Sequence, residues 1–434
     1  MATEKSEDLA QRVDLILRNT QEVVTRDELL HLMATKQNPN VYWGTAPTGP
    51  IHIGYFIPGV KLSNFVSTGF NTTILIADIH AYLDAQKTPW DQLDKRSAYY
   101  EGVMRTMLGN LGVDTSRLKF VKGSEFQTSR QYVFDVLKMA GITDVLRARR
   151  SAAEVVKQQD NPLISSLVYP LMQIADVPGL QADVSYGGVD QRKIYMLGRE
   201  LLPQLGCEAP LTCVFTPMLP GVTGKKMSAS EPESKIDLMD SDDVIRAKIK
   251  KAFCPDGAAM LYAMRNANPL AEDRIRVEGG KFSSESAWLR GVLQMHDIPD
   301  SKLEDNLQVL ADVFSNGTII SSPESYRASV VSAGPTLGRR VIESENGILA
   351  FLGNVVFPIK SHKGEKFIMR REMKHGGDVE YDSFSDLLQD YVIGNIFPGD
   401  LKSAAADAII ELVTPIRKFL DTSGLYAQAY GDRK

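Results

Sequence analysis

An apolar strand, a turn rich in glycine and proline, and the start of a helix follow one another early in the chain. The strand is expected over 40–44 and includes Val-Tyr-Trp-Gly, the turn contains Ala-Pro-Thr-Gly-Pro-Ile-His-Ile-Gly at 46–54, and the helix is expected to run toward Gly69. Such a connection forms an anion site, because unpaired backbone N–H groups and the helix dipole both face the ligand. His52 lies at the helix start and can donate to a phosphate, while Gly54 lets a nucleotide approach the backbone closely.

The composition limits the classes of protein to consider. The 434 residues suffice for two or three domains, and the hydrophobic content of 43% and charged content of 24% are typical of a soluble globular protein. No apolar run is long enough to span a membrane, and the acidic N-terminus does not resemble a leader peptide. The three cysteines have neither zinc spacing nor an even count, so reduced thiols and a cytoplasmic location are expected. The net charge of −5 argues against indiscriminate nucleic-acid binding but allows a local basic face.

Strands and helices are expected to alternate between residues 40 and 217. The predicted strands cover 40–44, 72–77, 118–122, 183–186 and 211–215, and the predicted helices cover 91–112, 129–141, 163–176 and 190–205. Apolar strands joined by helical crossovers predict an α/β domain with a doubly wound parallel sheet of the Rossmann type. Ligands of this architecture bind beyond the carboxyl ends of the strands, where His52, Asp78 and Gly188 would lie.

Regions outside this alternation differ in character. Two short helices are expected within residues 8–36, the second opened by a capping box that begins at Thr25. Clusters of Gly, Ser and Pro interrupt the pattern after residue 257, and helices are expected again at 383–394 and 400–420. The predicted organisation is therefore N-terminal helices over 1–39, a Rossmann-type domain over 40–257, an unassigned insertion over 258–345 and a mainly helical domain over 346–434.

One predicted helix face carries three polar side chains in an otherwise apolar segment. Tyr169, Gln173 and Asp176 have the spacing i, i+4 and i+7, which places them on the same face. A solvated face is the simpler interpretation. The apolar neighbours instead favour a half-buried face, whose polar groups need partners that a bound zwitterion with a polar tip would supply.

Two further segments combine glycines with groups that suit a nucleotide. Gly-Gly-Val-Asp-Gln over 187–191 follows a strand, so that glycine would let a ribose approach, Asp190 could accept from its hydroxyls, and Gln191 could reach a neighbouring ligand. An ordinary strand–helix turn is an equal alternative. Gly-Val-Thr-Gly-Lys-Lys-Met-Ser-Ala-Ser over 221–230 suits a phosphate transition state, although alone it would be interpreted as an exposed loop.

In this order, the segments resemble the two signatures of class I aminoacyl-tRNA synthetases. The full pattern resembles the tyrosyl-tRNA synthetases of the eukaryotic and archaeal cytosolic type. The signatures are Pro-Thr-Gly-Pro-Ile-His-Ile-Gly-Tyr at 47–55 and Lys-Met-Ser-Ala-Ser at 226–230. The supporting segments are Tyr-Trp-Gly at 42–44, Ala-Asp-Ile-His-Ala-Tyr-Leu at 77–83, Tyr-Pro-Leu-Met-Gln-Ile-Ala-Asp at 169–176 and Gly-Gly-Val-Asp-Gln-Arg-Lys at 187–193. The resemblance covers roughly residues 8–257 and 346–420, and it implies a catalytic Rossmann-type domain followed by a helical anticodon-binding domain.

The activity implied by this resemblance is that of a tyrosine–tRNA ligase. The tyrosine carboxylate would attack the α-phosphorus of ATP, which enters with Mg²⁺, and the adenylate would then esterify the terminal ribose of tRNA(Tyr). Neither a tightly bound cofactor nor a protein-held metal is expected. The resemblance also implies a homodimer, with the connective segment 85–165 as its interface.

The resemblance assigns roles to individual residues of this chain. Tyr42 and Asp176 would hold the phenolic hydroxyl of tyrosine, and the residues at its amino end would be Tyr169, Gln173 and Gln191. The ATP-binding residues would be His52, Gly54, Gly188, Asp190, Lys226, Met227 and Ser228, of which His52, Gly54, Lys226 and Ser228 would be catalytic. The tRNA-binding residues would be Lys157, Arg192 and Lys193 at the acceptor end and His375, Phe397 and Asp400 at the anticodon, with a surface-turn residue as the less favoured alternative for each.

The chain departs from the wider class in both signatures. Tyr55 stands where many class I enzymes have a second histidine, and Ala229 stands where many have a lysine. Lys225 and Lys226 would then supply the positive charge of the second signature.

Three alternatives remain open from the sequence. A tryptophanyl-tRNA synthetase shares the scaffold, but an indole offers no acidic hydroxyl to a Tyr42–Asp176 pair. A small-molecule nucleotidylyltransferase would have no use for the C-terminal segments. A non-catalytic RNA-binding paralogue is disfavoured by the intact His52, Asp190 and Lys226.

Overall fold

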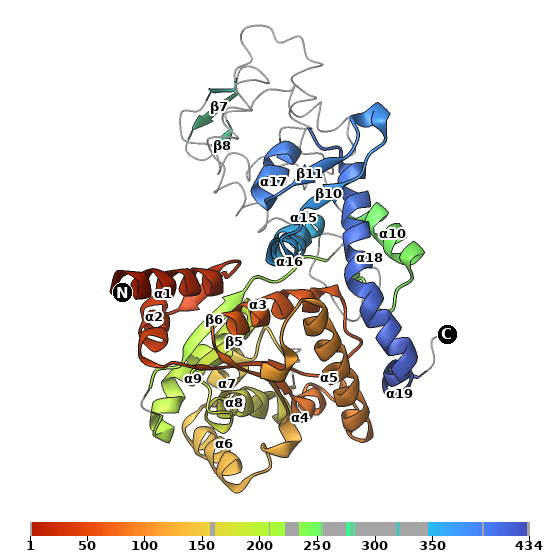
Figure 1. Cartoon of the computed structure of the whole chain (residues 1–434). Helices are drawn as coiled ribbons and strands as arrows, with labels where there is room; N and C mark the ends of the chain where they lie inside the picture. Colours follow the sequence, from red (N-terminus) through yellow and green to blue (C-terminus); the bar gives the residue numbers. More distant parts are fainter. Residues whose placement is uncertain are drawn as a thin grey trace. The chain divides into compact units, whose positions relative to one another are not determined.

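The computed structural model describes residues 2–156, 161–207, 209–221, 234–252, 254, 275–278, 281–282, 319–320, 346–392 and 395–431 (Figure 1). The chain divides into two compact units. The first contains residues 1–218, 237–239 and 412–434, and the second contains residues 219–236 and 240–411. In the described part of the chain, no helix combines the length and apolar character needed to cross a membrane.

A six-stranded sheet is the centre of the first unit. Its strands are β1 (Glu22–Val24), β2 (Asn40–Thr45), β3 (Asn71–Ile76), β4 (Leu118–Lys122), β5 (Val184–Gly188) and β6 (Thr212–Thr216). The spatial order is β1-β6-β5-β2-β3-β4, in which β2 to β6 run parallel and β1 is antiparallel to β6. The chain passes from β2 to β3 and β4 on one side and returns to β5 and β6 on the other. The switch point of a doubly wound sheet therefore lies between β2 and β5, which confirms the expected fold class.

The parallel strands lie within one or two residues of their predicted bounds. The edge strand β1 was not expected, because three residues between two helices carry no periodic signal. The N-terminal segment thus contributes both helices and a strand to this unit.

Helices cover the sheet of the first unit. They are α1 (Ala2–Leu17), α2 (Arg26–Thr35), α3 (Phe56–Ser67), α4 (Asp78–Leu83), α5 (Leu93–Asn110), α6 (Arg130–Ile142), α7 (Val145–Ser151), α8 (Ile164–Gly179), α9 (Arg192–Leu201) and α19 (Leu425–Tyr430). The capping box of α2 is confirmed, since the hydroxyl of Thr25 accepts from the backbone N–H of Glu28 and the carboxylate of Glu28 accepts from the backbone N–H of Thr25.

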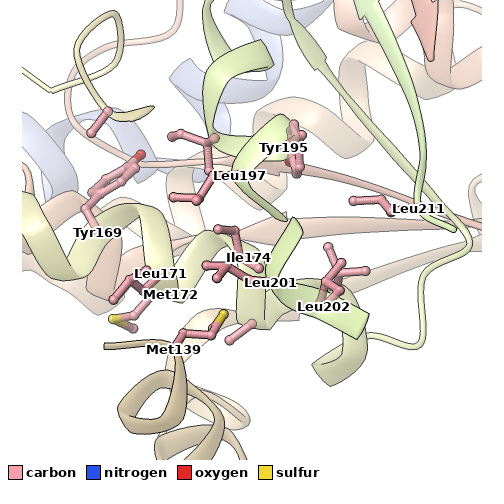
Figure 2. Packing of buried hydrophobic residues seen from close by; sticks show 14 of the residues in the cluster. Met139, Tyr169, Leu171, Met172, Ile174, Tyr195, Leu197, Leu201, Leu202 and Leu211 are labelled. Atoms are coloured by element: carbon pink, nitrogen blue, oxygen red, sulfur yellow. The ribbon is translucent and has the colours of Figure 1, made fainter. Parts of the chain in front are cut away.

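Successive residues of the strands point to opposite faces of the sheet, and both faces are buried. Tyr42, Leu75 and Phe215 belong to a core cluster with buried side chains of α8 and α9 (Figure 2). Their neighbour Trp43 contacts Tyr55 just before α3, on the other side of the strand. This period of two is typical of strands covered by helices on both faces.

The second unit combines helices with a β-hairpin. Its elements include α10 (Asp242–Lys251), α15 (Gly347–Phe351), a π-helical turn (Leu352–Val356), α16 (Phe357–Lys363), β10 (Phe367–Met369), β11 (Val379–Tyr381), α17 (Phe384–Val392) and most of α18 (Pro398–Ser423). The ring of Phe357 packs against Phe367 and Phe384, at centroid distances of 5.2 and 5.6 Å. The predicted helices at 383–394 and 400–420 are confirmed as α17 and α18. The hairpin of β10 and β11, which lies between α16 and α17 in the sequence, was not expected.

Short strands are also described within the insertion predicted over 258–345. β7 (Ile275–Glu278) pairs antiparallel with β8 (Lys281–Phe282) and with β9 (Ile319–Ile320). The remainder of that segment lies outside the described residues, and the division of the chain into the four expected regions remains a prediction.

A buried lysine closes the end of the first helix. Lys61 on α3 is only 2% exposed. Its Nζ donates to the carbonyl of Ile16 at 2.7 Å, to the carbonyl of Arg18 and to the hydroxyl of Thr20 at 2.9 Å. The last carbonyls of a helix have no partner within the helix, so Lys61 supplies donors that α1 itself lacks.

Replacing Lys61 with methionine should therefore destabilise the first unit. The apolar side chain would leave buried acceptors without a donor, and we expect the free energy of unfolding to fall by about 1–3 kcal/mol. Urea denaturation followed by circular dichroism measures this loss. Lys95→Met, at an exposed position of α5, is the control. Equal unfolding midpoints for the two variants would contradict the assigned role of Lys61.

Candidate active site

The described parts of the first signature and of the turn with Gly188 and Asp190 lie at the carboxyl ends of the parallel strands. β2 ends at Thr45, directly before the first signature, and β5 ends at Gly188. These two strands are neighbours in the sheet and flank its switch point. The architecture therefore brings segments that are 140 residues apart in sequence to one edge of the sheet.

The hydroxyl of Tyr42 is buried below this edge. Tyr42 is 1% exposed, and its hydroxyl lies 2.9 Å from the hydroxyl of Tyr195 and 3.2 Å from the backbone carbonyl oxygen of Gln173. Burial raises the pKa of Tyr42 well above its ordinary value, and the phenol of Tyr195 and the carboxylate of Asp176 add to this shift. Tyr42 is therefore a neutral hydrogen-bonding group at neutral pH.

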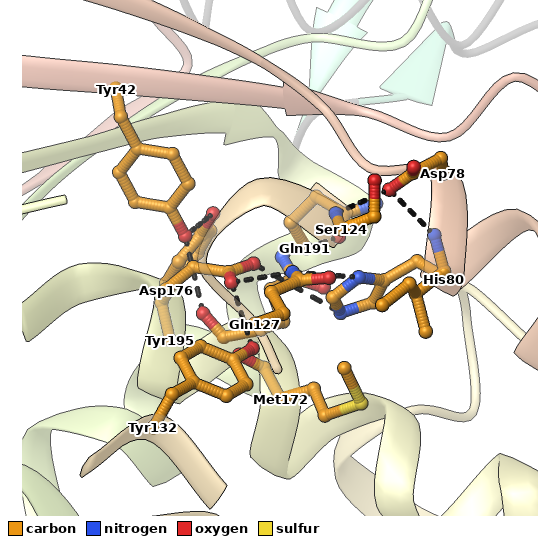
Figure 3. A network of polar contacts seen from close by, with 12 residues as sticks. Tyr42, Asp78, His80, Ser124, Gln127, Tyr132, Met172, Asp176, Gln191 and Tyr195 are labelled. Carbon is orange, nitrogen blue, oxygen red and sulfur yellow. Dashed lines mark hydrogen bonds and ion pairs between the residues drawn. The ribbon is translucent and has the colours of Figure 1, made fainter. Parts of the chain in front are cut away.

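Asp176 is the buried carboxylate of the site. Its Oδ1 accepts from Nε2 of Gln127 at 2.7 Å and lies 2.8 Å from the hydroxyl of Tyr132 (Figure 3). The Tyr132 hydroxyl is also 2.7 Å from the carbonyl oxygen of Met172. Burial raises the pKa of Asp176 to about 7, and the hydrogen bonds from Gln127 and Tyr132 oppose that shift.

A neutral histidine lies beside this carboxylate. Nε2 of His80 is 4.0 Å from Oδ2 of Asp176, and Nδ1 of His80 is 3.4 Å from Nε2 of Gln127. Burial lowers the pKa of His80 to about 4, so the ring is uncharged at neutral pH. Figure 3 shows Gln127 between the carboxylate and the imidazole. Asp176 is therefore held by uncharged donors and has no cationic partner in this network.

The residues expected at the amino end of a bound amino acid also lie close together. Nε2 of Gln173 donates to Oε1 of Gln191 at 3.0 Å, which joins α8 to the turn after β5. The ring of Tyr169 meets His80 edge-on, with centroids 4.7 Å apart. Burial raises the pKa of Tyr169, and the charge of Asp84 contributes to this shift.

Asp84 adds a negative group near Tyr169. Its carboxylate is buried, with Oδ2 bonded to Nζ of Lys87 at 2.6 Å. Its Oδ1 has no hydrogen-bond partner within the described part of the chain. A buried carboxylate oxygen without a hydrogen-bond donor beside it can bind a cationic group of a ligand.

Helix α5 holds the first signature from one side. The hydroxyl of Tyr100 donates to the carbonyl of Gly49 at 2.7 Å, and the backbone N–H of Ile51 donates to the hydroxyl of Tyr99 at 3.1 Å. A guanidinium nitrogen of Arg96 also donates to the carbonyl of Thr48 at 3.3 Å. The loop is thereby fixed at three successive points by side chains of a single helix.

His52 begins a 3₁₀ turn over Ile53–Tyr55, which leads into α3. Its Nδ1 accepts from the backbone N–H of Gly54 at 3.2 Å, so His52 caps the turn. Its backbone forms an antiparallel bridge with Asp237. The expected position of His52 at a helix start is confirmed, in a 3₁₀ turn rather than in the α-helix itself.

Gly188 and Asp190 lie together in the turn after β5. A Cβ atom added at Gly188 would lie 2.6 Å from Oδ1 of Asp190 and 3.1 Å from the sulfur of Met218. A larger residue here would have to displace the carboxylate of Asp190, so glycine keeps that carboxylate in place.

The two basic residues that follow this turn form ion pairs. The guanidinium of Arg192 donates to both carboxylate oxygens of Glu22, at 2.6 and 2.9 Å, and lowers the pKa of Glu22. Nζ of Lys193 is 2.6 Å from the carboxylate of Glu154. Both basic side chains remain substantially exposed.

Some predicted site residues cannot be compared with this geometry. Lys157, Lys226, Met227 and Ser228 lie outside the described residues, as does the side chain of His375. In the second unit, Phe397 is 63% exposed and precedes α18, and Asp400 lies in the first turn of that helix.

Four side chains of the network were not singled out from the sequence. They are His80, Gln127, Tyr132 and Tyr195, which come from α4, the turn after β4, α6 and α9. His80 lies within one of the segments that carry the resemblance, and Tyr195 follows another by two residues. Gln127 and Tyr132 belong to no motif of the resemblance, so only the tertiary structure identifies them as part of the site.

The chain is similar to known proteins in sequence and in structure. Residues 34–276 match the family model of class I tRNA synthetases for tryptophan and tyrosine. The chain is 36% identical to a tyrosine–tRNA ligase of Haloarcula marismortui, over 98% of this chain and 99% of that protein. It is 35% identical to a cytoplasmic tyrosine–tRNA ligase of Danio rerio, over 96% of this chain and 61% of that protein. A crystal structure of tyrosyl-tRNA synthetase from Archaeoglobus fulgidus, complexed with L-tyrosine, has a TM-score of 0.70 and 34% identity, over 95% of this chain and 99% of that one.

The raised pKa of Asp176 predicts an unusual dependence of stability on pH. The folded protein keeps this proton up to about pH 7, whereas the unfolded chain releases it near the ordinary pKa of 3.8. The folded state therefore binds more protons between these values, and its stability should fall as the pH rises through this window, by at most about 4 kcal/mol. Asp176→Asn should remove this contribution.

The free energy of unfolding, measured in urea at pH 5 and at pH 8, tests this prediction. Asp91→Asn, at an exposed position of the same unit, should keep the pH dependence of the wild type. The assignment would be disproved if the free energy of unfolding of Asp176→Asn changed between pH 5 and pH 8 by as much as that of the wild type.

Proposed function

The chain belongs to the class I tRNA synthetases of the tyrosine and tryptophan group, among the tyrosine–tRNA ligases, and from this premise we propose that it joins L-tyrosine to tRNA(Tyr) by way of tyrosyl-adenylate. ATP is the second substrate and enters with Mg²⁺. A cytoplasmic location is part of this proposal, in line with the name of the Danio rerio relative.

The buried carboxylate of Asp176, close to the hydroxyl of Tyr42, is the observation that carries this proposal. Both groups are at least nine-tenths buried, and both can hydrogen-bond a phenolic hydroxyl. A substrate that lacks the hydroxyl would give neither of these buried groups a further hydrogen bond, at a cost of about 1–3 kcal/mol for each bond. This pocket favours tyrosine over phenylalanine, and over the indole of tryptophan, whose N–H cannot accept a hydrogen bond.

The remaining residues of the site would orient the other parts of the substrates. Gln173, Gln191 and Tyr169 would face the ammonium group of tyrosine, and Asp84 would supply the negative charge that this end requires. This placement leaves the carboxylate of tyrosine directed toward the phosphates of ATP.

Adenylate formation needs no protein nucleophile. The tyrosine carboxylate oxygen attacks the α-phosphorus, the bond from that phosphorus to the bridging oxygen breaks, and pyrophosphate leaves. His52 and Gly54 of the first signature would contact the phosphates, together with Lys226, Met227 and Ser228 of the second. Mg²⁺ would neutralise charge on the departing pyrophosphate.

The nucleoside and the tRNA would be held by separate elements. The turn with Gly188 and Asp190 would receive the ribose of ATP. Lys157, Arg192 and Lys193 would contact the acceptor end of the tRNA. His375, Phe397 and Asp400 would contact the anticodon, where aromatic and imidazole rings can stack on an unpaired base and a carboxylate can accept from its edge.

Amino-acid-dependent exchange between ATP and pyrophosphate tests the activity. We expect exchange with tyrosine and none above background with tryptophan or phenylalanine, because only tyrosine satisfies both Tyr42 and Asp176. The three amino acids are compared in parallel at equal concentration, with radiolabelled pyrophosphate.

Each other result points to a specific alternative. Exchange with tryptophan would make the chain a tryptophanyl-tRNA synthetase and overturn the assigned pocket. No exchange with any of the three would favour a non-catalytic RNA-binding paralogue.

We further propose that the chain forms a homodimer through segment 85–165. Large apolar side chains of α6, α7 and the start of α8 are exposed in this segment. They are Val133, Phe134, Leu137, Ile142, Val145, Leu146, Leu163 and Ile164. On α6, Val133, Phe134 and Leu137 share one face, while Tyr132 and Met139 on another face are buried. Exposed large apolar side chains that cluster in one segment are typical of a protein interface.

Leu137→Glu should therefore dissociate the dimer. Leu137 is 60% exposed in the single chain, and a carboxylate there would be buried without a partner in the assembly. Light scattering at micromolar concentration should give twice the chain mass for the wild type and one chain mass for the variant. Val244→Glu, at an exposed apolar position of α10, should remain dimeric. A monomeric wild type would exclude the homodimer.

A further inference from the structure

Tyr195 occupies a position in the pocket that none of the roles above explains. It lies in the first turn of α9, is 1% exposed, and belongs to the buried cluster shown in Figure 2. Its hydroxyl is 2.9 Å from that of Tyr42, the residue assigned to the phenolic end of the substrate. Both hydroxyls are shielded from water, so one must donate a hydrogen bond to the other. The neighbouring groups decide which of the two is the donor.

An acceptor beside Tyr42 sets the direction of this hydrogen bond. The hydroxyl of Tyr42 has a single proton, and the backbone carbonyl of Gln173, 3.2 Å away, can only accept. When Tyr42 donates to this carbonyl, Tyr195 donates to the oxygen of Tyr42. The side chain of the same Gln173 donates to Oε1 of Gln191 at 3.0 Å. In this arrangement the hydroxyl protons of Tyr42 and Tyr195 each have an acceptor.

The hydrogen bonds thus form a series in the order Gln191, Gln173, Tyr42 and Tyr195. Gln191 and Gln173 are assigned to the amino end of tyrosine, and Tyr42 is assigned to the phenolic end. Figure 3 shows Tyr195 and Tyr42 pointing toward one another at the end of this series. Tyr195 therefore supports the phenolic end of the pocket.

Ring packing holds Tyr195 independently of its hydroxyl. The ring meets Tyr42 edge-on, with centroids 6.3 Å apart, and is tilted against Phe215 at 6.2 Å. These contacts would remain in Tyr195→Phe, which removes the hydroxyl alone. The substitution therefore separates the effect of the hydrogen bond from the effect of packing.

We propose that Tyr195 is a positioning residue for substrate tyrosine, which fixes the hydroxyl of Tyr42. This inference rests on the proposed tyrosine–tRNA ligase activity and assigns a specificity role to a residue outside both signatures. Without the Tyr195 hydroxyl, the Tyr42 oxygen loses a donor. The phenolic end of the pocket then becomes less well ordered.

Tyrosine-dependent exchange kinetics of Tyr195→Phe test the proposal. Loss of one neutral hydrogen bond corresponds to about a 3- to 10-fold change in an equilibrium constant. We expect the KM for tyrosine to rise by about this factor, with the KM for ATP unchanged and kcat changed less than twofold. The preference for tyrosine over phenylalanine in kcat/KM should fall by the same factor.

Tyr186→Phe is the matched control. Tyr186 on β5 is also 1% exposed, and its hydroxyl lies 3.4 Å from Oγ1 of Thr216. A general effect of removing a buried phenolic hydroxyl would change both variants equally. The proposal requires that Tyr186→Phe keep the tyrosine KM and the amino-acid preference of the wild type.

A double-mutant cycle with Tyr42→Phe gives a second readout. If Tyr195 acts through Tyr42, the double variant should have nearly the same tyrosine KM as Tyr42→Phe alone. Multiplicative effects of the two substitutions would show that Tyr195 acts elsewhere, and a wild-type KM in Tyr195→Phe would also overturn the proposal. These outcomes leave the activity intact, whereas absence of tyrosine-dependent exchange in the wild type would remove both the activity and this inference.

Discussion

The burial of a polar helix face within an apolar core is the constraint on which the site depends. Helix α8 contributes Leu171, Ile174 and Ala175 to the core, and the same helix carries Gln173 and Asp176. A carboxylate can remain in such a place only if donors surround it, because an unpaired buried charge destabilises the fold. The side chains that satisfy Asp176 are therefore structural and functional at once, since they keep the helix buried and preserve an acceptor for a ligand.

This constraint explains why the network is built from uncharged groups. Gln127 and Tyr132 stabilise the carboxylate with hydrogen bonds, and the neutral His80 fills the space beside it. An arginine or lysine in this position would form a closed ion pair and would lower the pKa of Asp176. Neutral donors instead stabilise the carboxylate without adding a cation beside it.

The nucleotide end of the site relies on a different support. Three side chains of α5 bind the backbone of the first signature, which leaves the loop few alternative conformations. Helix α19, from the end of the chain, packs on α5 through Tyr430, whose ring lies 5.2 Å from Tyr99 and under the guanidinium of Arg96 at 4.9 Å. The C-terminal residues of the chain thus belong to the same unit as the signature loop.

Local sequence patterns predicted the parallel strands and the polar face of α8. The apolar runs predicted the parallel strands because residues buried on both faces of a sheet have no polar alternation, and the turn at 46–54 predicted the site because few residue types permit that backbone. The i, i+4 and i+7 spacing placed Tyr169, Gln173 and Asp176 on one face because helical geometry is local.

Only the tertiary structure identified the partners of those residues. Gln127, Tyr132 and Tyr195 come from separate elements, and strand β1 pairs with β6 almost 190 residues away in the sequence. Hydrogen bonds between distant segments leave no period in the sequence, because each partner needs only the right side chain at a single position. The sequence by itself therefore determined the scaffold and the polar face of α8, whereas the tertiary structure decided which groups hold Asp176 and Tyr42 in place.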